Sequence, residues 1–297
     1  MKPLCIYHGH CDDGFAAAWV VRAATGSDLF DFYPGVYQQQ PPDVTGRHVL
    51  FADFSYKRPV LLDMAAKARS IVILDHHKTA AEDLAGFREP AAFNLWAQNK
   101  NPLVEDSGVP IATLFDMKRS GAGLAWDFFF AGKPRPDFIN YIEDRDLWRK
   151  ALLNGDEFTI ALRSYPHDFD VWDGLVRAGA QSLIEEGRSI QRYYRLRIDE
   201  LKRAAYLANI LLPDGSEHLC AVANAPYFAA SEVAGELCDI KEAKFGACYF
   251  EASGGRWVYS LRSRGDYDVS AVAVQFGGGG HENAAGFSSC APVHKTL

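Results

Sequence analysis

The sequence predicts an α/β protein: a parallel-sheet domain, then a helical linker, then a smaller α/β C-terminal domain. Three observations predict this fold class. Apolar strand-like runs alternate with helical stretches in the first half, which is typical of a parallel sheet covered by helices. A long helical stretch follows at about residues 178–208, and strand-like runs return after it. We place the domains at residues 1–165 and 209–297, with the connector at residues 166–208.

The first half contains four short apolar runs with the length of buried strands. They are LCIYH (4–8), LFDFY (29–33), HVLFADF (48–54) and SIVILD (70–75). Helical stretches are predicted between them at residues 15–25 and 59–70. Residues 78–113 contain scattered Asn, Pro and Gly, which predicts loops and short elements.

The middle of the chain predicts helices, and the last third predicts a second α/β unit. Residues 112–132 look like helical segments broken near Gly121 and Gly123. Residues 136–148 begin with a proline and an acid, which is typical of a helix start. In the last third, strands are predicted at 218–225, 245–252 and 256–264, and a helix at 231–239.

Composition excludes several classes of protein. The chain has 297 residues, of which 48% are hydrophobic and 23% charged, as in ordinary soluble proteins. Its apolar runs are too short to span a membrane, and its N-terminus lacks a signal-peptide pattern, so we expect a cytoplasmic protein. Six cysteines without a CxxC pair argue against a disulfide scaffold. A net charge of −7 favours a small anionic substrate over long nucleic acid.

Aspartate and histidine follow three of the predicted strands, where parallel sheets bind ligands. These residues are His8 with Asp12 and Asp13, then Asp53, then Asp75 with His76 and His77. A further acidic pair, Asp144 and Asp146, follows the helix expected at 137–143. Taken singly, these aspartates could be helix caps, turn residues or solvated charges. Together they predict a two-metal site that activates water against a phosphate, because oxygen and imidazole ligands suit manganese, iron or zinc.

Several motifs resemble the DHH phosphoesterase superfamily, which includes RecJ-like exonucleases and nano-RNases. LDHHKTA (74–80) resembles its signature, and HGHCDDG (8–14), FADF (51–54) and IEDRD (142–146) resemble further motifs in the same order. SLRSRGDYDVSAVAVQFGGGGHENAAGF (260–287) resembles the DHH-associated C-terminal domain. The resemblance covers most of the chain.

The resemblance implies a role for each matching residue. His8 binds one metal, and Asp53 bridges two. Asp13, His76 and Asp144 complete the other metal site. Asp75 orients a histidine ligand. His77 faces the substrate phosphate, so that Asp53, His76 and His77 form the catalytic set.

One position departs from the family pattern. The first motif of the family normally has two aspartates in a D-x-D-G arrangement, and here Cys11 stands in place of the first. Three outcomes are open: Asp12 substitutes, Cys11 ligates, or the first metal binds weakly.

The run Gly277 to Gly280 predicts a phosphate-binding loop rather than a flexible turn, because it adjoins RSRGDYDVS and HENAAG. Consecutive backbone N–H groups can cradle an anion, and a helix starting at ENAAG would add its dipole. The predicted substrate-binding residues are Arg262, Gly278, Gly279, Gly280, His281 and Asn283.

The predicted function is hydrolysis of phosphodiester bonds in short oligonucleotides, with one or two Mn2+ ions; Mg2+ or another divalent cation is an alternative. Other substrates left open are a 3′,5′-bisphosphate nucleotide and a cyclic dinucleotide. The alternative outside enzymes is a nucleotide-binding sensor with a degraded metal site, motivated by Cys11. A short oligonucleotide or nucleotide is the expected partner, a membrane is not, and a homodimer is left open.

Overall fold

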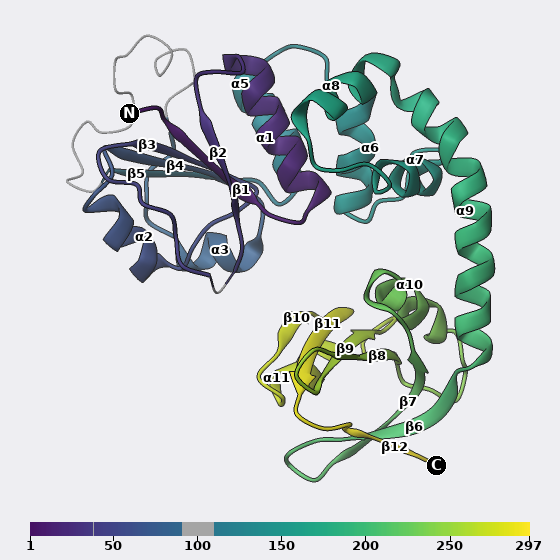
Figure 1. Cartoon of the computed structure of the whole chain (residues 1–297). Coiled ribbons are helices and arrows are strands. Elements are labelled where there is room, and N and C mark those ends of the chain that lie inside the picture. The colour runs from purple at the N-terminus through teal and green to yellow at the C-terminus, as the bar shows by residue number, and fades with distance from the viewer. Residues whose placement is uncertain (38, 91–109) are drawn as a thin grey trace. The chain divides into compact units, whose positions relative to one another are not determined.

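The computed structural model of the protein describes residues 1–37, 39–90 and 110–297. These residues form two compact units, Met1–Gln191 and Arg192–Leu297. The boundary lies inside the long helix α9 (Ala180–Arg203), drawn in teal and green in Figure 1. None of the helices in these ranges has the length and apolarity needed to cross a membrane.

The first unit is built on a five-stranded parallel sheet in the order β2-β1-β3-β4-β5. Its strands are β1 (Leu4–His8), β2 (Asp31–Gly35), β3 (His48–Ala52), β4 (Ser70–Asp75) and β5 (Ile111–Phe115). Its helices are α1 (Asp12–Thr25), α2 (Arg58–Ala65), α3 (Lys78–Asp83), α5 (Gly121–Phe129), α6 (Asp137–Asp146), α7 (Gly155–Leu162) and α8 (Phe169–Ala178). The predicted α/β class and parallel sheet are confirmed.

Side chains on alternate positions of each strand enter two separate cores, as the period of two requires. Val72 and Leu74 of β4 pack with α1, α5 and α6, whereas Ile71 and Ile73 pack with α2. Figure 1 shows α1 and α2 on opposite faces of this sheet. Both faces are covered, which explains why β4 is an uninterrupted apolar run.

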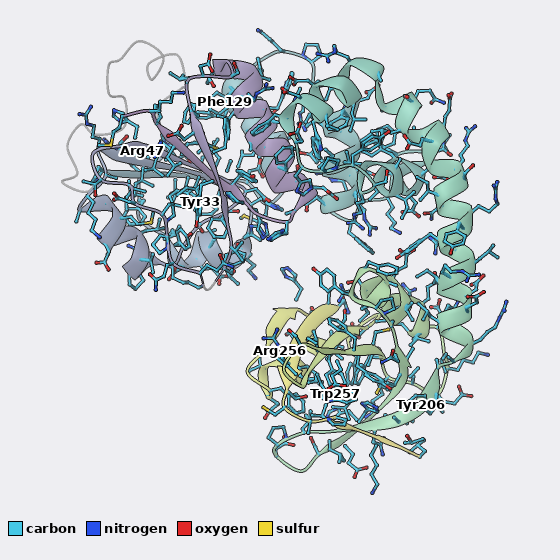
Figure 2. All side chains as sticks on the ribbon, in the orientation of Figure 1. Tyr33, Arg47, Phe129, Tyr206, Arg256 and Trp257 are labelled. Atoms are coloured by element: carbon cyan, nitrogen blue, oxygen red, sulfur yellow. The ribbon has the colours of Figure 1, made fainter. Side chains whose placement is uncertain are left out.

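The second unit contains a seven-stranded sheet in the order β10-β11-β9-β8-β7-β6-β12. Its strands are β6 (Tyr206–Leu211), β7 (Glu217–Asn224), β8 (Gly246–Ala252), β9 (Arg256–Arg262), β10 (Gly279–His281), β11 (Ala284–Ser289) and β12 (His294–Thr296). Helix α10 (Tyr227–Leu237) connects the parallel pair β7 and β8, and α11 (Val269–Val274) precedes β10. Tyr206 and Trp257 belong to the aromatic side chains that pack around this sheet (Figure 2).

Three sequence predictions of local structure are wrong. Residues 112–132 are not all helical, because β5 occupies 111–115 and α5 begins only at Gly121. The linker helix ends at Arg203, and β6 occupies the end of the predicted stretch. The helix expected at ENAAG is strand β11. Of the mixed segment 78–113, α3 and β5 are seen, and residues 91–109 lie outside the described residues.

Candidate metal centre

The carboxyl ends of β1, β3 and β4 bring histidine and aspartate to one edge of the first sheet. β1 ends at His8, Asp53 follows β3, and β4 ends at Asp75 with His76 and His77 next. β1 lies between β2 and β3 in the sheet. The connection from β1 to β2 therefore runs toward one edge of the sheet, and the connection from β3 to β4 runs toward the other. Such a switch point is the usual ligand site of an open α/β sheet.

Asp53 lies at the centre of this cluster. Its carboxylate is buried, with Oδ2 at 3.3 Å from Nδ1 of His8 and Oδ1 at 3.1 Å from Nε2 of His76. The backbone of Asp53 is left-handed, with φ of 60°, a conformation that Asp tolerates better than most residues. Its N–H donates to the carbonyl of Leu74 at 2.9 Å. The bond to β4 therefore helps to hold the carboxylate of Asp53 between His8, which ends β1, and His76, which follows β4.

Asp13, in the first turn of α1, supplies a second buried carboxylate. It accepts hydrogen bonds from the backbone N–H groups of Gly121 (2.5 Å) and Ala122 (3.0 Å) at the start of α5. Unpaired N–H groups and the helix dipole both favour a carboxylate at this end of a helix. Its Oδ2 lies 3.9 Å from Nε2 of His76, so α5 holds Asp13 toward the cluster.

Asp75 orients His77. Its Oδ1 accepts hydrogen bonds from the backbone N–H groups of His76 (2.7 Å) and His77 (3.2 Å), and lies 2.7 Å from Nδ1 of the His77 ring. An N–H at Nδ1 leaves Nε2 of His77 as the ring atom available to the site. The predicted orienting carboxylate thus acts on the second histidine of the DHH tripeptide.

The acidic pair at the end of α6 separates into two environments. Oδ2 of Asp146 lies 3.5 Å from Nε2 of His76, and Asp13, His76 and Asp146 offer ligand atoms within 4.8 Å of one another. Asp144 instead accepts hydrogen bonds from the backbone N–H groups of Ala151 (3.0 Å) and Leu152 (3.2 Å). Residues two apart on a helix do not share a face. Asp146, and not the predicted Asp144, therefore joins the cluster.

Asp12 and Cys11, the two candidates to replace the missing aspartate of the first motif, lie in different surroundings. Asp12 accepts a hydrogen bond from Nε of Arg163 at 3.1 Å and lies 3.1 Å from Nε2 of His167. Cys11, at the N-cap of α1, offers a ligand atom within 4.8 Å of those of His8 and Asp53. The structure thus places Cys11, and not Asp12, beside the first histidine.

Negative charge is crowded in this cluster. Burial and the charges of Asp53 and Asp146 raise the pKa of Asp13 well above its ordinary value. Burial and the charge of Asp53 raise the pKa of Asp146 to about 6. Burial opposes protonation of His76, but the carboxylates of Asp53, Asp13 and Asp146 outweigh it and raise its pKa to about 9. Protons and histidines offset this charge here, and a divalent cation would do so more strongly.

In the second unit, Arg262 ends β9 and is braced against neighbouring groups. It donates from Nη2 to Oγ of Ser231 (2.7 Å) and from Nη1 to the carbonyl of Leu261 (2.8 Å). Burial lowers the pKa of its guanidinium. A guanidinium has five N–H donors, so Arg262 can both brace α10 and bind an anion.

The second half of the glycine run, Gly279 and Gly280, belongs to an edge strand rather than to an open loop. β10 pairs with β11 in antiparallel register, with Gly280 opposite Ala285. A Cβ at Gly278 would lie 2.2 Å from the carbonyl oxygen of Gly286, and one at Gly280 would lie 2.4 Å from that of Ala284. These two glycines are therefore required because the strands approach too closely for side chains.

The polar residues of this hairpin differ in their contacts. His281 is exposed at the end of β10. The side-chain amide of Asn283 donates to Oγ of Ser263 and to the carbonyl of Gly265, both at 3.0 Å. Asn283 thus ties the hairpin to the loop after β9, beside Arg262.

Comparison with protein-family models identifies this second unit. Residues 219–294 match the DHHA1 domain family. The chain carries a DHHA1 domain. The match runs from β7 into β12 and includes Arg262 and the glycines of β10. The match confirms the DHH-associated C-terminal domain that the sequence resemblance predicts.

Similar proteins and structures extend the comparison to the whole chain. An uncharacterised protein of Acanthamoeba polyphaga mimivirus is 28% identical, over 98% of this chain and 69% of that protein. The pGpG-specific phosphodiesterase PggH of Vibrio cholerae shares the fold with a TM-score of 0.50 and 10% identity, over 97% of this chain and 93% of that one. RecJ of Thermus thermophilus, solved in complex with Mn2+, has a TM-score of 0.49 and 15% identity, over 97% of this chain and 49% of that one.

The side chains that accompany the DHHA1 domain in this chain fit a divalent cation. Buried Nδ1 of His8, Oδ1 of Asp53 and Oδ2 of Asp75 have no hydrogen-bond partner in the described part of the chain. Among the described residues, three groups offer ligand atoms within 4.8 Å of one another: His8 with Cys11 and Asp53, Asp53 with His76 and His77, and Asp13 with His76 and Asp146. Asp53 and His76 each belong to two groups, as neighbouring cations that share ligands would require. Carboxylate oxygen with imidazole nitrogen suits manganese, iron or zinc.

Sequence reasoning missed the residues that hold the start of α5. Ser120 caps the helix, accepting from the N–H of Gly123 at 3.1 Å, and its own N–H donates to buried Glu143 at 3.2 Å. Glu143 pairs with Arg135 (3.0 Å), Arg149 (3.1 Å) and Arg119 (3.6 Å). A serine directly before Gly-rich helical sequence is a start signal that could have located α5. The arginines come from three separate segments and have no common spacing from Glu143.

Proposed function

We propose that this protein is a metal-dependent phosphoesterase that hydrolyses phosphodiester bonds of short oligonucleotides, with one or two Mn2+ ions. The observation that carries the proposal is the position of Asp53. Its two carboxylate oxygens lie 3.3 Å from His8 and 3.1 Å from His76, at the switch point of the sheet. The proposed ligands are His8, Asp13, Asp53, His76 and Asp146, with Cys11 beside His8.

Divalent cations held there would stabilise the charge of a phosphate and make water more acidic. The chain positions the remaining groups. Asp75 fixes the ring of His77, whose centroid lies 5.7 Å from that of His8, so this imidazole is directed to the same site. Burial opposes protonation of His77, but the hydrogen bond and charge of Asp75 raise its pKa, and the protonated ring can donate from Nε2 to a phosphate oxygen as negative charge develops.

The substrate class rests on three supports. The net charge of −7 disfavours long nucleic acids, which are held by many phosphate contacts. The chain has a DHHA1 domain, in which Arg262 and His281 can bind a phosphate. PggH, which shares the fold, is named for cleavage of a linear dinucleotide. We therefore propose a linear dinucleotide or slightly longer oligomer, bound by Arg262, His281 and the backbone of Gly278, Gly279 and Gly280.

The test is incubation with Mn2+ or Mg2+ and a ladder of 5′-phosphorylated RNA and DNA, two to twenty-four nucleotides long. The proposal expects the shortest oligomers to be cleaved fastest to mononucleotides. Phosphate release from 3′-phosphoadenosine 5′-phosphate alone would make the protein a nucleotidase. No hydrolysis of any substrate, with nucleotide binding retained, would make it a sensor.

A further inference from the structure

An exposed aromatic ring lies in the loop that directly follows the metal cluster. α6 ends at Asp146 and Trp148 comes two residues later, so their Cα atoms lie within about 7 Å. Trp148 is 61% exposed, whereas Trp126 and Trp172 are buried. Tryptophan is highly buried on average, so an exposed one beside a metal cluster indicates a binding role.

The backbone of this loop is strained. Trp148 has φ of 54° and Lys150 has φ of 48°. Left-handed backbone is unfavourable for residues with bulky side chains, and it persists where the surroundings impose it, commonly at functional sites. In this loop the strain turns an apolar ring toward solvent, although burial would stabilise it.

Residues of α6 impose that conformation. The carboxylate of Asp144 accepts the backbone N–H groups of Ala151 and Leu152, and the carbonyl of Asp144 accepts that of Arg149 at 2.9 Å. The guanidinium of Arg149 also donates to Glu143 at 3.1 Å. The same turn of helix that carries Asp146 therefore holds the loop, and a fixed geometry relates the ring to the cluster.

Two cationic side chains lie near the ring, and one of them, Lys150, is also paired with Asp156 at 3.6 Å. The guanidinium carbon of Arg145 lies 4.1 Å and Nζ of Lys150 lies 4.9 Å from the centroid of the Trp148 ring. Aromatic faces stack on bases, and neighbouring cations bind the phosphates of the strand that carries them. In a chain of net charge −7, this basic segment is complementary to a nucleotide.

We propose that Trp148 stacks on the nucleobase next to the phosphate held at the metal cluster, with Arg145 and Lys150 against the adjacent backbone phosphate. The subsite takes one nucleotide of a single strand and tolerates any base, because every base has a π face. The inference rests on the proposed function, and it adds the base as a required part of the substrate.

The first test measures binding without turnover. AMP and ribose 5-phosphate are titrated into the wild type and into Trp148→Phe, Trp148→Leu and Tyr193→Leu. Tyr193 is a matched control: it is 63% exposed with Arg197 at 5.2 Å from its ring, but lies on α9 in the second unit. We expect AMP to bind more tightly than ribose 5-phosphate in the wild type, Trp148→Phe and Tyr193→Leu. In Trp148→Leu this preference should fall by roughly 5- to 100-fold.

The second test measures hydrolysis of a 5′-phosphorylated dinucleotide. We expect Trp148→Leu to raise KM with little change in kcat, Trp148→Phe to recover most of the loss, and Tyr193→Leu to have no effect. Hydrolysis with unchanged KM and unchanged base preference in Trp148→Leu would overturn this inference and leave the proposed function standing. If the protein hydrolyses nothing but its preference for AMP over ribose 5-phosphate depends on Trp148, the result would support the subsite and refute the proposed hydrolytic function.

Discussion

The carboxylate of Asp13 accepts a 2.5 Å hydrogen bond from the backbone N–H of Gly121, which lies 108 residues further along the chain. This bond joins the first turn of α1 to the first turn of α5. A Cβ at Gly121 would lie 2.2 Å from the Cβ of Asp53. One glycine at the start of α5 therefore sets the positions of two carboxylates of the cluster.

Gly121→Ala is predicted to impair the site. The added methyl group must displace Asp53 or the start of α5, which separates Asp53 from His76 and weakens the bond to Asp13. We expect at least about a tenfold loss of Mn2+ affinity, measured by calorimetry, and a similar loss of hydrolysis. Gly174→Ala is the control, because no atom lies within 4 Å of its added Cβ in α8. That variant should gain roughly 0.5–1 kcal/mol of stability and keep its metal affinity.

Asp144→Asn and Asp146→Asn are predicted to have different effects. Asn at 144 leaves one of the N–H groups of Ala151 and Leu152 without its acceptor, so we expect a loss of about 1–3 kcal/mol in unfolding experiments. Asn at 146 removes a carboxylate whose ionised form is disfavoured without metal, so the metal-free protein should be as stable as the wild type or more so. Its Mn2+ affinity should fall at least about tenfold. A loss of Mn2+ affinity in Asp144→Asn, with unchanged affinity in Asp146→Asn, would show that Asp144 is the ligand.

Cys11→Asp tests whether the cysteine weakens the first metal site. Burial and the charges of Asp53 and Asp13 raise the pKa of the Cys11 thiol well above its ordinary value, so the protonated thiol is a poor ligand. A carboxylate at this position binds hard cations better and also caps α1 well. We expect a higher Mn2+ stoichiometry or affinity in Cys11→Asp than in Cys11→Ala. Equal Mn2+ binding by the two variants would exclude position 11 from the site.

Metal affinity is predicted to rise with pH. A metal ligand must lose its proton, and the pKa of His76 is raised to about 9 and that of Asp146 to about 6. Below pH 6 both protons compete with the metal, and between pH 6 and 9 the proton of His76 still does. We expect the Mn2+ association constant to increase about tenfold per pH unit in this second range, with one proton released. Calorimetry in buffers of different ionisation enthalpy counts that proton, and a pH-independent constant would contradict the assignment.

The sequence was sufficient for four of the five strands of the first sheet and for the strand-end residues, because both follow from local patterns. The β4 run SIVILD predicts a buried parallel strand, and Asp75, His76 and His77 must then lie at its carboxyl end. The choice between Asp144 and Asp146 was not predictable. It depends on helix phase and on the loop that Asp144 holds, and that loop has no sequence signature.

The glycine run illustrates a second limit. Consecutive glycines indicate close backbone approach, but the partner can be a ligand or another strand. Here the carbonyl groups of Gly286 and Ala284 occupy the space beside Gly278 and Gly280. The position of this partner strand depends in turn on the antiparallel pairing of β11 with β9, which joins Ala284 to Arg262 and Ser289 to Trp257.

Hydrolysis of a 5′-phosphorylated dinucleotide in the presence of Mn2+ tests the central claim most directly. The proteins compared are the wild type, Asp53→Asn, which keeps the size of the side chain and its left-handed backbone, and Asp63→Asn, an exposed control on α2. We predict that the wild type and Asp63→Asn release mononucleotides and that chelation stops the release. Asp53→Asn should remain folded and lose at least about a hundredfold in rate. Hydrolysis by Asp53→Asn at the wild-type rate, or hydrolysis that chelation does not affect, would contradict the claim that Asp53 organises a metal-dependent phosphoesterase site.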